Sequence, residues 1–239
     1  MIHPAWRHPR SARVCGVSHR IHPSILNADL ARLDDEIRRI PSADGVHLDV
    51  MDNHFVPNLT IGLPVIESIR AAHPDRFLDI HLMITDADRF APAYAELGCE
   101  SVTFHIEASD APIRTARTLR GLGSKAAVGL RPQTPIEPLA DFITEFDMVL
   151  IMTVDPGFGG QSFLADMLPK IRRTREIVAR TGQDIWIQVD GGVAESTLDQ
   201  CIDAGANVFV AGSAVFRAED PDAMVRGLAA QAGARCPAH

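Results

Sequence analysis

Cysteine is scarce in this sequence and its distribution excludes two kinds of site. Cys15, Cys99, Cys201 and Cys236 are widely spaced and form no CxxC pair, which argues against a disulfide framework and against a structural zinc site. No apolar stretch reaches the roughly 18 residues that a membrane-spanning helix requires, and the N-terminus lacks the continuous apolar segment of a secretion signal. We therefore expect a soluble protein of the reducing cytoplasm.

An excess of basic residues is also lacking. Lysine and arginine total 23 against 31 acidic residues, which gives a net charge of -8. This balance argues against a nucleic-acid backbone or an anionic membrane as the partner. A small anion would need a local binding site.

The first twenty residues differ from the rest of the chain. They contain four arginines, no acidic residue and no clear helical or strand period. A transit peptide can have this composition, but a convincing amphipathic helix is missing. We expect residues 1–20 to form a disordered extension and residues 21–239, which suffice for one sizeable core, to form a single domain.

From Arg20 onward, short apolar or β-branched runs alternate with helical patterns of about ten to fifteen residues, as in repeated βα units. Eight such runs are present, at 20–26, 45–50, 77–83, 101–106, 126–130, 148–152, 186–190 and 207–211. Eight strands, each followed by a helix, predict an α/β fold of the single (β/α)8 TIM-barrel type. Its active site should lie at the carboxyl ends of the strands.

Two of the helical patterns are clear and one is weak. Residues 28–40 and 169–181 carry apolar side chains at helical spacing. The segment 134–146 contains two prolines, so we expect a short helix that starts near Pro138.

Polar side chains interrupt three of the predicted strands. His47 and Asp49 are two apart on one strand and therefore share a face. A buried ionised carboxylate costs several kcal/mol unless it is paired or bound to a metal. Taken alone, such a pair is most often a hydrogen-bonded core feature. His81 and Asp190, near the ends of the third and seventh strands, complete a set of two imidazoles and two carboxylates suited to Zn²⁺, Fe²⁺, Mn²⁺ or Co²⁺.

Two further polar residues lie one layer deeper. Asp79 precedes His81 by two positions and Gln188 precedes Asp190 by two. Each could orient a metal ligand or make an ordinary structural contact.

Glycines follow the last two predicted strands. Gly191 and Gly192 follow the seventh, and Gly212 and Ser213 follow the eighth, where barrels often bind phosphate. Glycine lets backbone N–H groups approach an anion closely. The two clusters together predict a phosphate site.

The segment 152–163, "MTVDPGFGGQSF", is a long glycine-rich loop with an apolar Phe158. We interpret it as a lid, although an ordinary flexible loop has the same composition. Met51, Met83 and Met152 follow three strands at matching heights. Methionine is usually core filler, but above a metal these side chains would keep water from a reactive carbanion.

A series of motifs then resembles one known family. From about Ile21 to the last helix, the sequence is similar to ribulose-phosphate 3-epimerases in "PSILNADLARL", "HLDVMDNHFVPNLTIG", "DIHLM", "FHIEA", "MTVDPGFGGQSF", "VDGGV" and "FVAGSAVF". The resemblance implies an isomerase of carbohydrate metabolism that interconverts D-ribulose 5-phosphate and D-xylulose 5-phosphate in the pentose phosphate pathway. Its partner would be a small sugar phosphate, and we expect a homo-oligomer.

The resemblance also implies roles for individual residues. His47, Asp49, His81 and Asp190 would bind one divalent metal ion, with Asp49 as proton acceptor and Asp190 as donor. The substrate-binding residues would be Ser24, His81, Asp190, the lid residues Gly157, Phe158, Gly159 and Gly160, and the phosphate-binding Gly191, Gly192, Gly212 and Ser213.

The chemistry of the residues agrees with these roles. Loss of the C3 proton leaves an ene-diolate, whose negative charge a metal stabilises by several kcal/mol. Inversion then needs one carboxyl group on each face, one protonated and the other ionised.

Three positions depart from the family pattern. Asn53 stands where many relatives have glycine, His22 where alanine is commoner, and Asn27 where serine is usual. None of them is a predicted ligand. His22 could reach the pocket or fill the barrel, and we favour filling.

Three other functions are compatible with parts of the sequence. An allulose 6-phosphate 3-epimerase would use the same metal and acids, although "FGGQ" and "GGV" favour the pentose substrate. A non-catalytic sugar-phosphate-binding barrel would not need four ligands. A metal-free lyase or synthase generally needs a catalytic lysine, and neither Lys125 nor Lys170 is expected at a strand end that faces the pocket.

Overall fold

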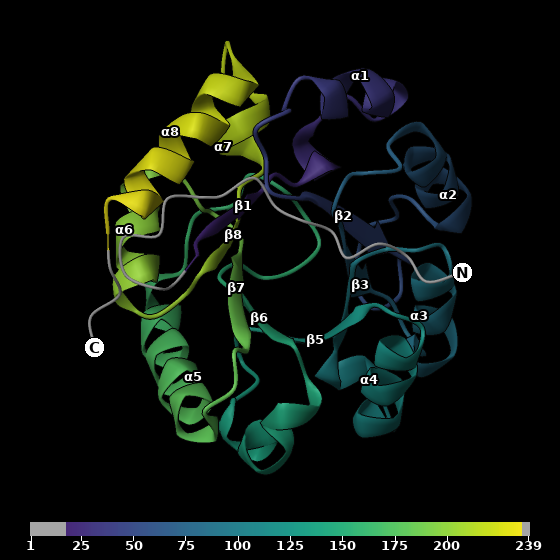
Figure 1. The fold of residues 1–239 in the computed structure, drawn as a ribbon, viewed down its shortest axis with the longest axis vertical. Helices are drawn as coiled ribbons and strands as arrows, with labels where there is room; N and C mark the ends of the chain where they lie inside the picture. Colours follow the sequence, from purple (N-terminus) through teal and green to yellow (C-terminus); the bar gives the residue numbers. More distant parts are fainter. Residues whose placement is uncertain (1–17, 236–239) are drawn as a thin grey trace.

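Eight parallel strands form one sheet at the centre of the protein (Figure 1). The structure is a computed structural model, and it describes residues 18–235. The strands are β1 (Arg20–His22), β2 (Val46–Met51), β3 (Leu78–Met83), β4 (Ser101–His105), β5 (Lys125–Leu130), β6 (Met148–Met152), β7 (Trp186–Asp190) and β8 (Val208–Val210). From β2 to β8 each strand pairs with its sequence neighbours, and β1 pairs with β8. The single-barrel prediction is confirmed. The extension expected at residues 1–20 lies almost entirely outside the described residues.

Helices surround the strands on the outside (Figure 1). The α-helices are α1 (Leu33–Arg38), α2 (Leu63–Ala72), α3 (Ala87–Glu96), α4 (Pro112–Gly121), α5 (Leu168–Thr181), α6 (Glu195–Asp203), α7 (Ser213–Phe216) and α8 (Pro221–Gly233). The 3₁₀ turns are η1 (Ile25–Asn27), η2 (Leu30–Arg32), η3 (Ile106–Ala108), η4 (Glu137–Glu145) and η5 (Ala165–Met167).

The barrel closes between β1 and β2 through a short contact. Ser24 and His47 form an isolated parallel bridge, and the His47 N–H donates to the carbonyl of Pro23 at 2.9 Å. The first strand is shorter than the predicted 20–26 because Pro23 has no N–H to donate to a ladder. Ser24 then caps η1 by accepting the N–H of Leu26.

Helix boundaries differ from the sequence prediction at two places. The predicted helix at 28–40 divides into η2 and α1. The predicted short helix near Pro138 is the 3₁₀ turn η4, and Phe142 inside it has non-helical dihedral angles. The long apolar pattern at 169–181 corresponds to α5.

Alternation along the strands separates two buried environments. On β2, Val46, Leu48 and Val50 belong to the apolar cluster that packs against the helices. His47 and Asp49 lie on the other face, inside the barrel, and are also buried. The apolar layer between strands and helices therefore supplies most of the core, and the inward face of β2 carries polar groups.

Candidate metal centre

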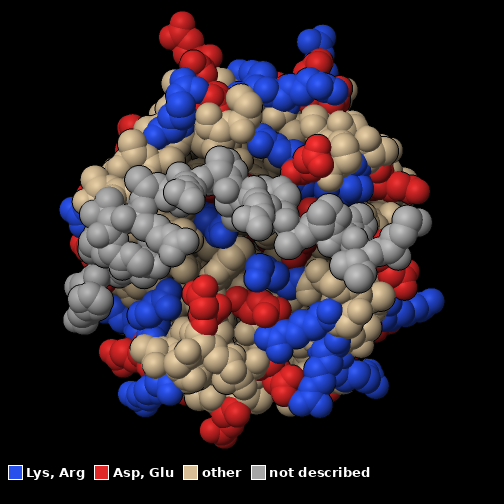
Figure 2. All heavy atoms as spheres, viewed as in Figure 1, with Lys and Arg blue, Asp and Glu red and all other residues tan. Residues whose placement is uncertain are grey.

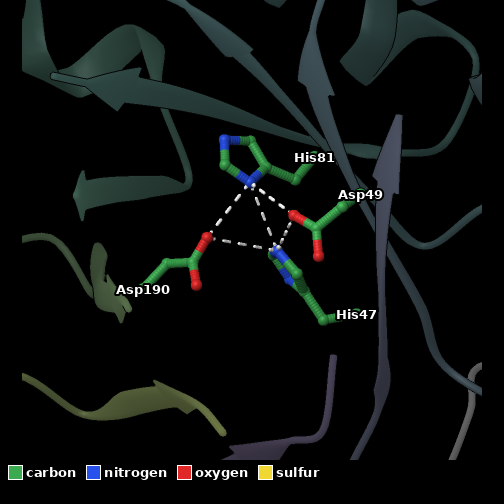
Figure 3. A group of neighbouring side chains, drawn as sticks. All are labelled: His47, Asp49, His81 and Asp190. Carbon is green, nitrogen blue, oxygen red and sulfur yellow. Dashed lines mark hydrogen bonds and ion pairs between the residues drawn. The ribbon is translucent and has the colours of Figure 1, made fainter. Parts of the chain in front are cut away.

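Four polar side chains from three strands point toward one another inside the mouth of the barrel (Figure 3). His47 and Asp49 come from β2, His81 from β3 and Asp190 from the end of β7. One ligand atom from each residue lies within 4.8 Å of the other three. The structure thus brings together the four residues that the sequence singles out as metal ligands.

The separations that involve the two imidazoles are close to those around a tetrahedral ion. Nε2 of His47 lies 3.3 Å from Nδ1 of His81 and 3.7 Å from Oδ2 of Asp190. Nδ1 of His81 lies 3.2 Å from Oδ1 of Asp49 and 3.3 Å from Oδ2 of Asp190. Atoms bound at about 2.0–2.1 Å to the centre of a tetrahedron are about 3.3–3.4 Å apart. The donor set of two imidazoles and two carboxylates also suits a divalent transition metal.

Because these side chains are buried, the negative charge of the carboxylates must be balanced by a metal cation or by protons on the imidazoles. His47 and His81 are fully buried, and Asp49 is 4% exposed. Burial raises the pKa of Asp49, but His47 and His81 outweigh it and hold that pKa well below the ordinary range. Burial lowers the pKa of His47, but the carboxylates of Asp49 and Asp79 raise it well above its ordinary value. When no metal ion is bound, protons on the imidazoles therefore balance the negative charge of the carboxylates.

Asp79 fixes the orientation of one imidazole from below. Its Oδ2 accepts hydrogen bonds from Nδ1 of His47 at 2.9 Å, from Nδ1 of His22 at 2.9 Å and from Nε2 of Gln188 at 2.5 Å. Because a carboxylate only accepts, Nδ1 of His47 carries a proton, and in the neutral ring Nε2 is left as a free ligand. The two deeper polar residues thus contact each other, and Asp79 contacts a ligand directly.

His22 fills the barrel interior, as the sequence favours. The side chain is fully buried beneath the four ligands, and its ring lies against Phe77 with centroids 5.4 Å apart. The side chain therefore fills space in the barrel and also makes a polar contact, its hydrogen bond to Asp79. Among the described residues, three polar atoms of this layer have no hydrogen-bond partner, namely Nε2 of His22, Oδ1 of Asp79 and Oε1 of Gln188.

His105 contacts His81, and Glu107 contacts His105 in turn. Nε2 of His81 lies 2.9 Å from Nε2 of His105, the last residue of β4. Nδ1 of His105 lies 3.1 Å from Oε2 of Glu107 in η3. Burial lowers the pKa of His105 to about 4. Burial raises the pKa of Glu107, but His105 outweighs it and brings the pKa to about 2. The "FHIEA" motif contains both residues, and strand alternation from Ser101 and Thr103 places His105 on the inward face.

A pocket opens above the ligands. The predicted site residues that line it are Ser24, Asp49, Met51, Met83, Met152, Gly157, Phe158, Gly159, Gly160, Asp190, Gly191, Gly192, Gly212 and Ser213. His47 and His81 are not in the lining and lie beneath it, against Asp49 and Asp190.

One end of the pocket is a cradle of backbone groups. Gly191 and Gly192 have φ of 112° and 68°, and a Cβ at Gly192 would lie 2.6 Å from the backbone of Phe163. Only glycine fits such a position. No hydrogen-bond partner within residues 18–235 takes up the N–H groups of Gly192, Gly212 and Ser213. Since α7 has only four residues, anion binding would depend on these N–H groups more than on a helix dipole.

Asn27, a departure from the family pattern, supports the same end of the pocket. A Cβ at Gly159 would lie 2.5 Å from its side chain, and a Cβ at Gly212 would lie 2.3 Å from it. Asn27 therefore links the lid to the loop after β8. Asn53, another departure, has a φ of 58°, a conformation that asparagine tolerates in place of glycine.

Residues of the predicted lid line the pocket on the β6 side. Asn58 donates to the carbonyl of Gly157 at 2.9 Å, and Gln161 donates to the carbonyls of Asp155 and Phe158. Phe158 itself is 55% exposed. Asn58 and Gln161 thus hold backbone carbonyls of this loop, while the Phe158 side chain is largely in solvent.

The three methionines line the pocket in two groups, Met51 with Met83 and Met152 apart from them. Met51 and Met83 are neighbours in the β2–β3 register, and Met152 is the register neighbour of Asp190. Each is at most 2% exposed. They supply apolar surface to the pocket near Asp49 and Asp190.

Ser24 contacts the metal centre directly. Its hydroxyl donates to Oδ2 of Asp49 at 2.5 Å, while Oδ1 of the same carboxylate faces His81. The residue that the resemblance places on the sugar therefore also holds the carboxylate.

The surface agrees with the charge balance of the sequence. On the face that Figure 2 shows, lysine and arginine side chains are interspersed with aspartate and glutamate side chains. Within the described part of the chain, no helix combines the length and the apolar character that crossing a membrane demands.

The model of the "Ribulose-phosphate 3 epimerase family" matches residues 20–216. The chain belongs to this family. It is 51% identical to the ribulose-phosphate 3-epimerase of Mycobacterium tuberculosis over 214 residues, which cover 90% of this chain and 93% of the relative. It is 45% identical to the Bacillus subtilis ribulose-phosphate 3-epimerase over 204 residues, or 84% of this chain and 94% of the relative.

Solved structures of other activities share the fold. A 3-keto-L-gulonate-6-phosphate decarboxylase from Vibrio cholerae matches with a TM-score of 0.69 at 16% identity, covering 92% of this chain and 100% of that chain. A 3-hexulose-6-phosphate synthase matches with a TM-score of 0.67 at 21% identity, covering 89% of this chain and 99% of that chain. At these identities the likeness shows the barrel fold alone.

Proposed function

We propose that this chain is a ribulose-phosphate 3-epimerase (EC 5.1.3.1) of the pentose phosphate pathway, which acts in the cytoplasm and inverts C3 of D-ribulose 5-phosphate to give D-xylulose 5-phosphate. Residues 21–239 would be its catalytic domain, and its working state a homo-oligomer. Relatives of that name at 51% identity support the reaction. The observation that carries the proposal is the convergence of His47, Asp49, His81 and Asp190 on one point at the floor of the pocket.

These four side chains would hold one divalent ion, with Fe²⁺, Zn²⁺, Mn²⁺ and Co²⁺ as the candidates that their donor atoms suit. When bound, the ion would supply electrostatic stabilisation for the negative charge that develops on the C2 and C3 oxygens. His47 and His81 are fully buried, so their part is to bind and to exclude water from below.

Asp49 and Asp190 would move the protons. Asp49 would accept the C3 proton of ribulose 5-phosphate and Asp190 would deliver a proton to the opposite face, with the roles exchanged in reverse. The two residues lie on β2 and β7, which are separated by β1 and β8 around the barrel, and both line the pocket. The hydroxyl of Ser24 holds one oxygen of Asp49 and would thereby orient the carboxylate toward the sugar.

The rest of the pocket would bind and enclose the substrate. The N–H groups of Gly191, Gly192, Gly212 and Ser213 would hold the phosphate. The lid residues from Gly157 to Gly160 would close over the sugar. The apolar side chains of Met51, Met83 and Met152 would keep water from the carbanion, whose protonation by solvent would scramble the stereochemistry.

Two alternatives fit the structure less well. A sugar-phosphate-binding barrel without activity would have no need for two carboxylates and two imidazoles converging beneath the ligand. A lysine-dependent lyase is disfavoured because Lys125 lies at the start of β5 with its Nζ over the Trp186 ring. Lys170 is also engaged, since its Nζ donates to the carbonyls of Arg131 and Pro132.

The test is epimerisation of ribulose 5-phosphate in deuterated water, with and without a chelator. We expect xylulose 5-phosphate that carries deuterium at C3, and loss of turnover when the metal is removed. Allulose 6-phosphate is assayed in parallel. Faster turnover of the hexose phosphate would assign the chain to that substrate, and no turnover of either sugar by metal-loaded protein would refute the proposal.

A further inference from the structure

We propose that Glu107 and His105 are positioning residues that fix which ring nitrogen of His81 faces the metal centre. The inference rests on the metal site of the proposed function. It concerns neither a ligand nor a group that touches the sugar, because both residues act through His81.

The three residues form one hydrogen-bonded line from the pocket floor to the loop after β4. Nδ1 of His81 faces the metal centre, and Nε2 on the other side of the ring lies 2.9 Å from Nε2 of His105. The two rings are close to parallel and lie end to end, with centroids 5.1 Å apart and an interplanar angle of 26°. Nδ1 of His105 then lies 3.1 Å from Oε2 of Glu107.

The carboxylate of Glu107 determines which ring nitrogens of His105 and His81 carry a proton. An ionised carboxylate has only acceptor atoms, so Nδ1 of His105 must donate to Glu107. In a neutral ring, Nε2 of His105 is then an acceptor and receives its hydrogen bond from Nε2–H of His81. Consequently Nδ1 of His81 carries no proton and presents its lone pair to the ion. The opposite order would place a proton on Nδ1 of His81 and block it as a ligand.

The route through His105 follows from the strand register. Thr103 on β4 is the register partner of His81, and its hydroxyl has no hydrogen-bond partner among the described residues. The strand β4 itself contains no acidic residue. His105, the next inward residue of β4, is fully buried. Its ring spans the distance between His81 and the carboxylate of Glu107. His47 needs no such relay because Asp79 contacts it directly.

The second oxygen of Glu107 makes a decisive variant possible. Oε1 accepts the N–H of Arg131 at 2.9 Å and the hydroxyl of Thr134. In a Glu107→Gln variant, the amide oxygen keeps these two donors, so the amide NH₂ faces His105. Nδ1 of His105 must then accept, and the proton order of the whole line reverses without a change in side-chain shape.

The experiment measures the dissociation constants of Zn²⁺ and Co²⁺ for the wild-type chain and for Glu107→Gln, by competition with a chromogenic chelator. We expect the affinity of the variant to fall about 10- to 100-fold, with an altered visible spectrum of bound Co²⁺. Thr134→Val removes a partner of Oε1 alone, and Glu137→Gln removes an exposed acid paired with Arg173. Both controls should keep wild-type metal affinity.

The outcomes separate the inference from the proposed function. A wild-type chain that binds neither ion refutes the metal site itself. A wild-type chain that binds both, with a Glu107→Gln variant of equal affinity and unchanged Co²⁺ spectrum, overturns only the inference. ¹⁵N spectra of the zinc-loaded wild-type chain provide a test that needs no variant. We expect protons on Nδ1 of His105 and Nε2 of His81, and a proton on Nε2 of His105 would overturn the inference.

Discussion

His47 and His81 present different ring nitrogens to the same point: Nε2 of one lies 3.3 Å from Nδ1 of the other. Each outer nitrogen is occupied by a hydrogen bond, to Asp79 for His47 and to His105 for His81. Two neighbouring strands can therefore supply two imidazole ligands to one ion although their residues differ in height along the barrel. The orientation of each ring is set by residues below or beside the site.

Asp79→Asn should weaken metal binding about 10- to 100-fold, because the neutral amide is a poorer acceptor for Nδ1 of His47 and leaves its ring less firmly oriented. The measurement is the Zn²⁺ dissociation constant. His22→Ala is the matched control, since it removes another partner of the same Asp79 oxygen. It should lower the thermal stability while metal affinity stays near the wild-type value. Wild-type affinity in Asp79→Asn would show that His47 is oriented by other contacts.

Gly192→Ala should impair the phosphate end of the pocket. A Cβ there meets the backbone of Phe163 at 2.6 Å in addition to the strain of a positive φ, so the N–H groups must move. We expect a rise of at least about tenfold in the KM for ribulose 5-phosphate, equivalent to about 1.4 kcal/mol. Gly182→Ala is the control, because Gly182 also has a positive φ of 67° but an added Cβ would meet no atom within 4 Å. That control should lose about 1 kcal/mol of stability and keep its KM, and equal KM values in both variants would contradict the assignment.

Metal binding should become tighter as the pH rises. The pKa of His47 lies well above its ordinary value of 6.5 without an ion, because Asp49 and Asp79 outweigh the effect of burial. A bound ion must therefore displace protons, and its apparent affinity falls as the pH is lowered. Isothermal titration calorimetry in buffers of different ionisation enthalpy measures the protons released. Metal affinity independent of pH between about pH 6 and 9 would contradict this description of the centre.

Asp52 should stabilise the loop after β2 in a pH-dependent manner. It accepts the N–H groups of His54 and Phe55 and both donors of Thr85. Burial raises its pKa, but these hydrogen bonds outweigh it and lower the value from 3.8 to about 2. A lowered folded-state pKa gives stability that is present above pH 3.8 and lost as the pH falls toward 2.

The measurement for Asp52 is urea unfolding of the wild-type chain and of Asp52→Asn at a series of pH values. The wild-type chain should be the more stable one at neutral pH, and the difference should shrink below pH 3.8. A stability difference that stays constant down to the acid limit would show that the charge of Asp52 does not contribute.

The barrel and its ligands could be predicted because they depend on short-range patterns. Alternation puts His47 and Asp49 on one face, and parallel strands bring the ends of β2, β3 and β7 to one mouth. Glu107 could not be predicted in the same way, since it lies in a 3₁₀ turn where alternation no longer specifies direction. Asn27 is a similar case, because its contacts with Gly159 and Gly212 join segments that are distant in the sequence.

Proton exchange in two single variants tests the central claim most directly, namely that Asp49 and Asp190 serve opposite faces of one carbon. In deuterated water with metal present, Asp190→Asn should exchange the C3 proton of ribulose 5-phosphate without forming xylulose 5-phosphate. Asp49→Asn should exchange only that of xylulose 5-phosphate, and both should lose at least about 10²-fold in epimerisation. Undiminished epimerisation by either variant, or exchange of both sugars by one of them, would contradict the account.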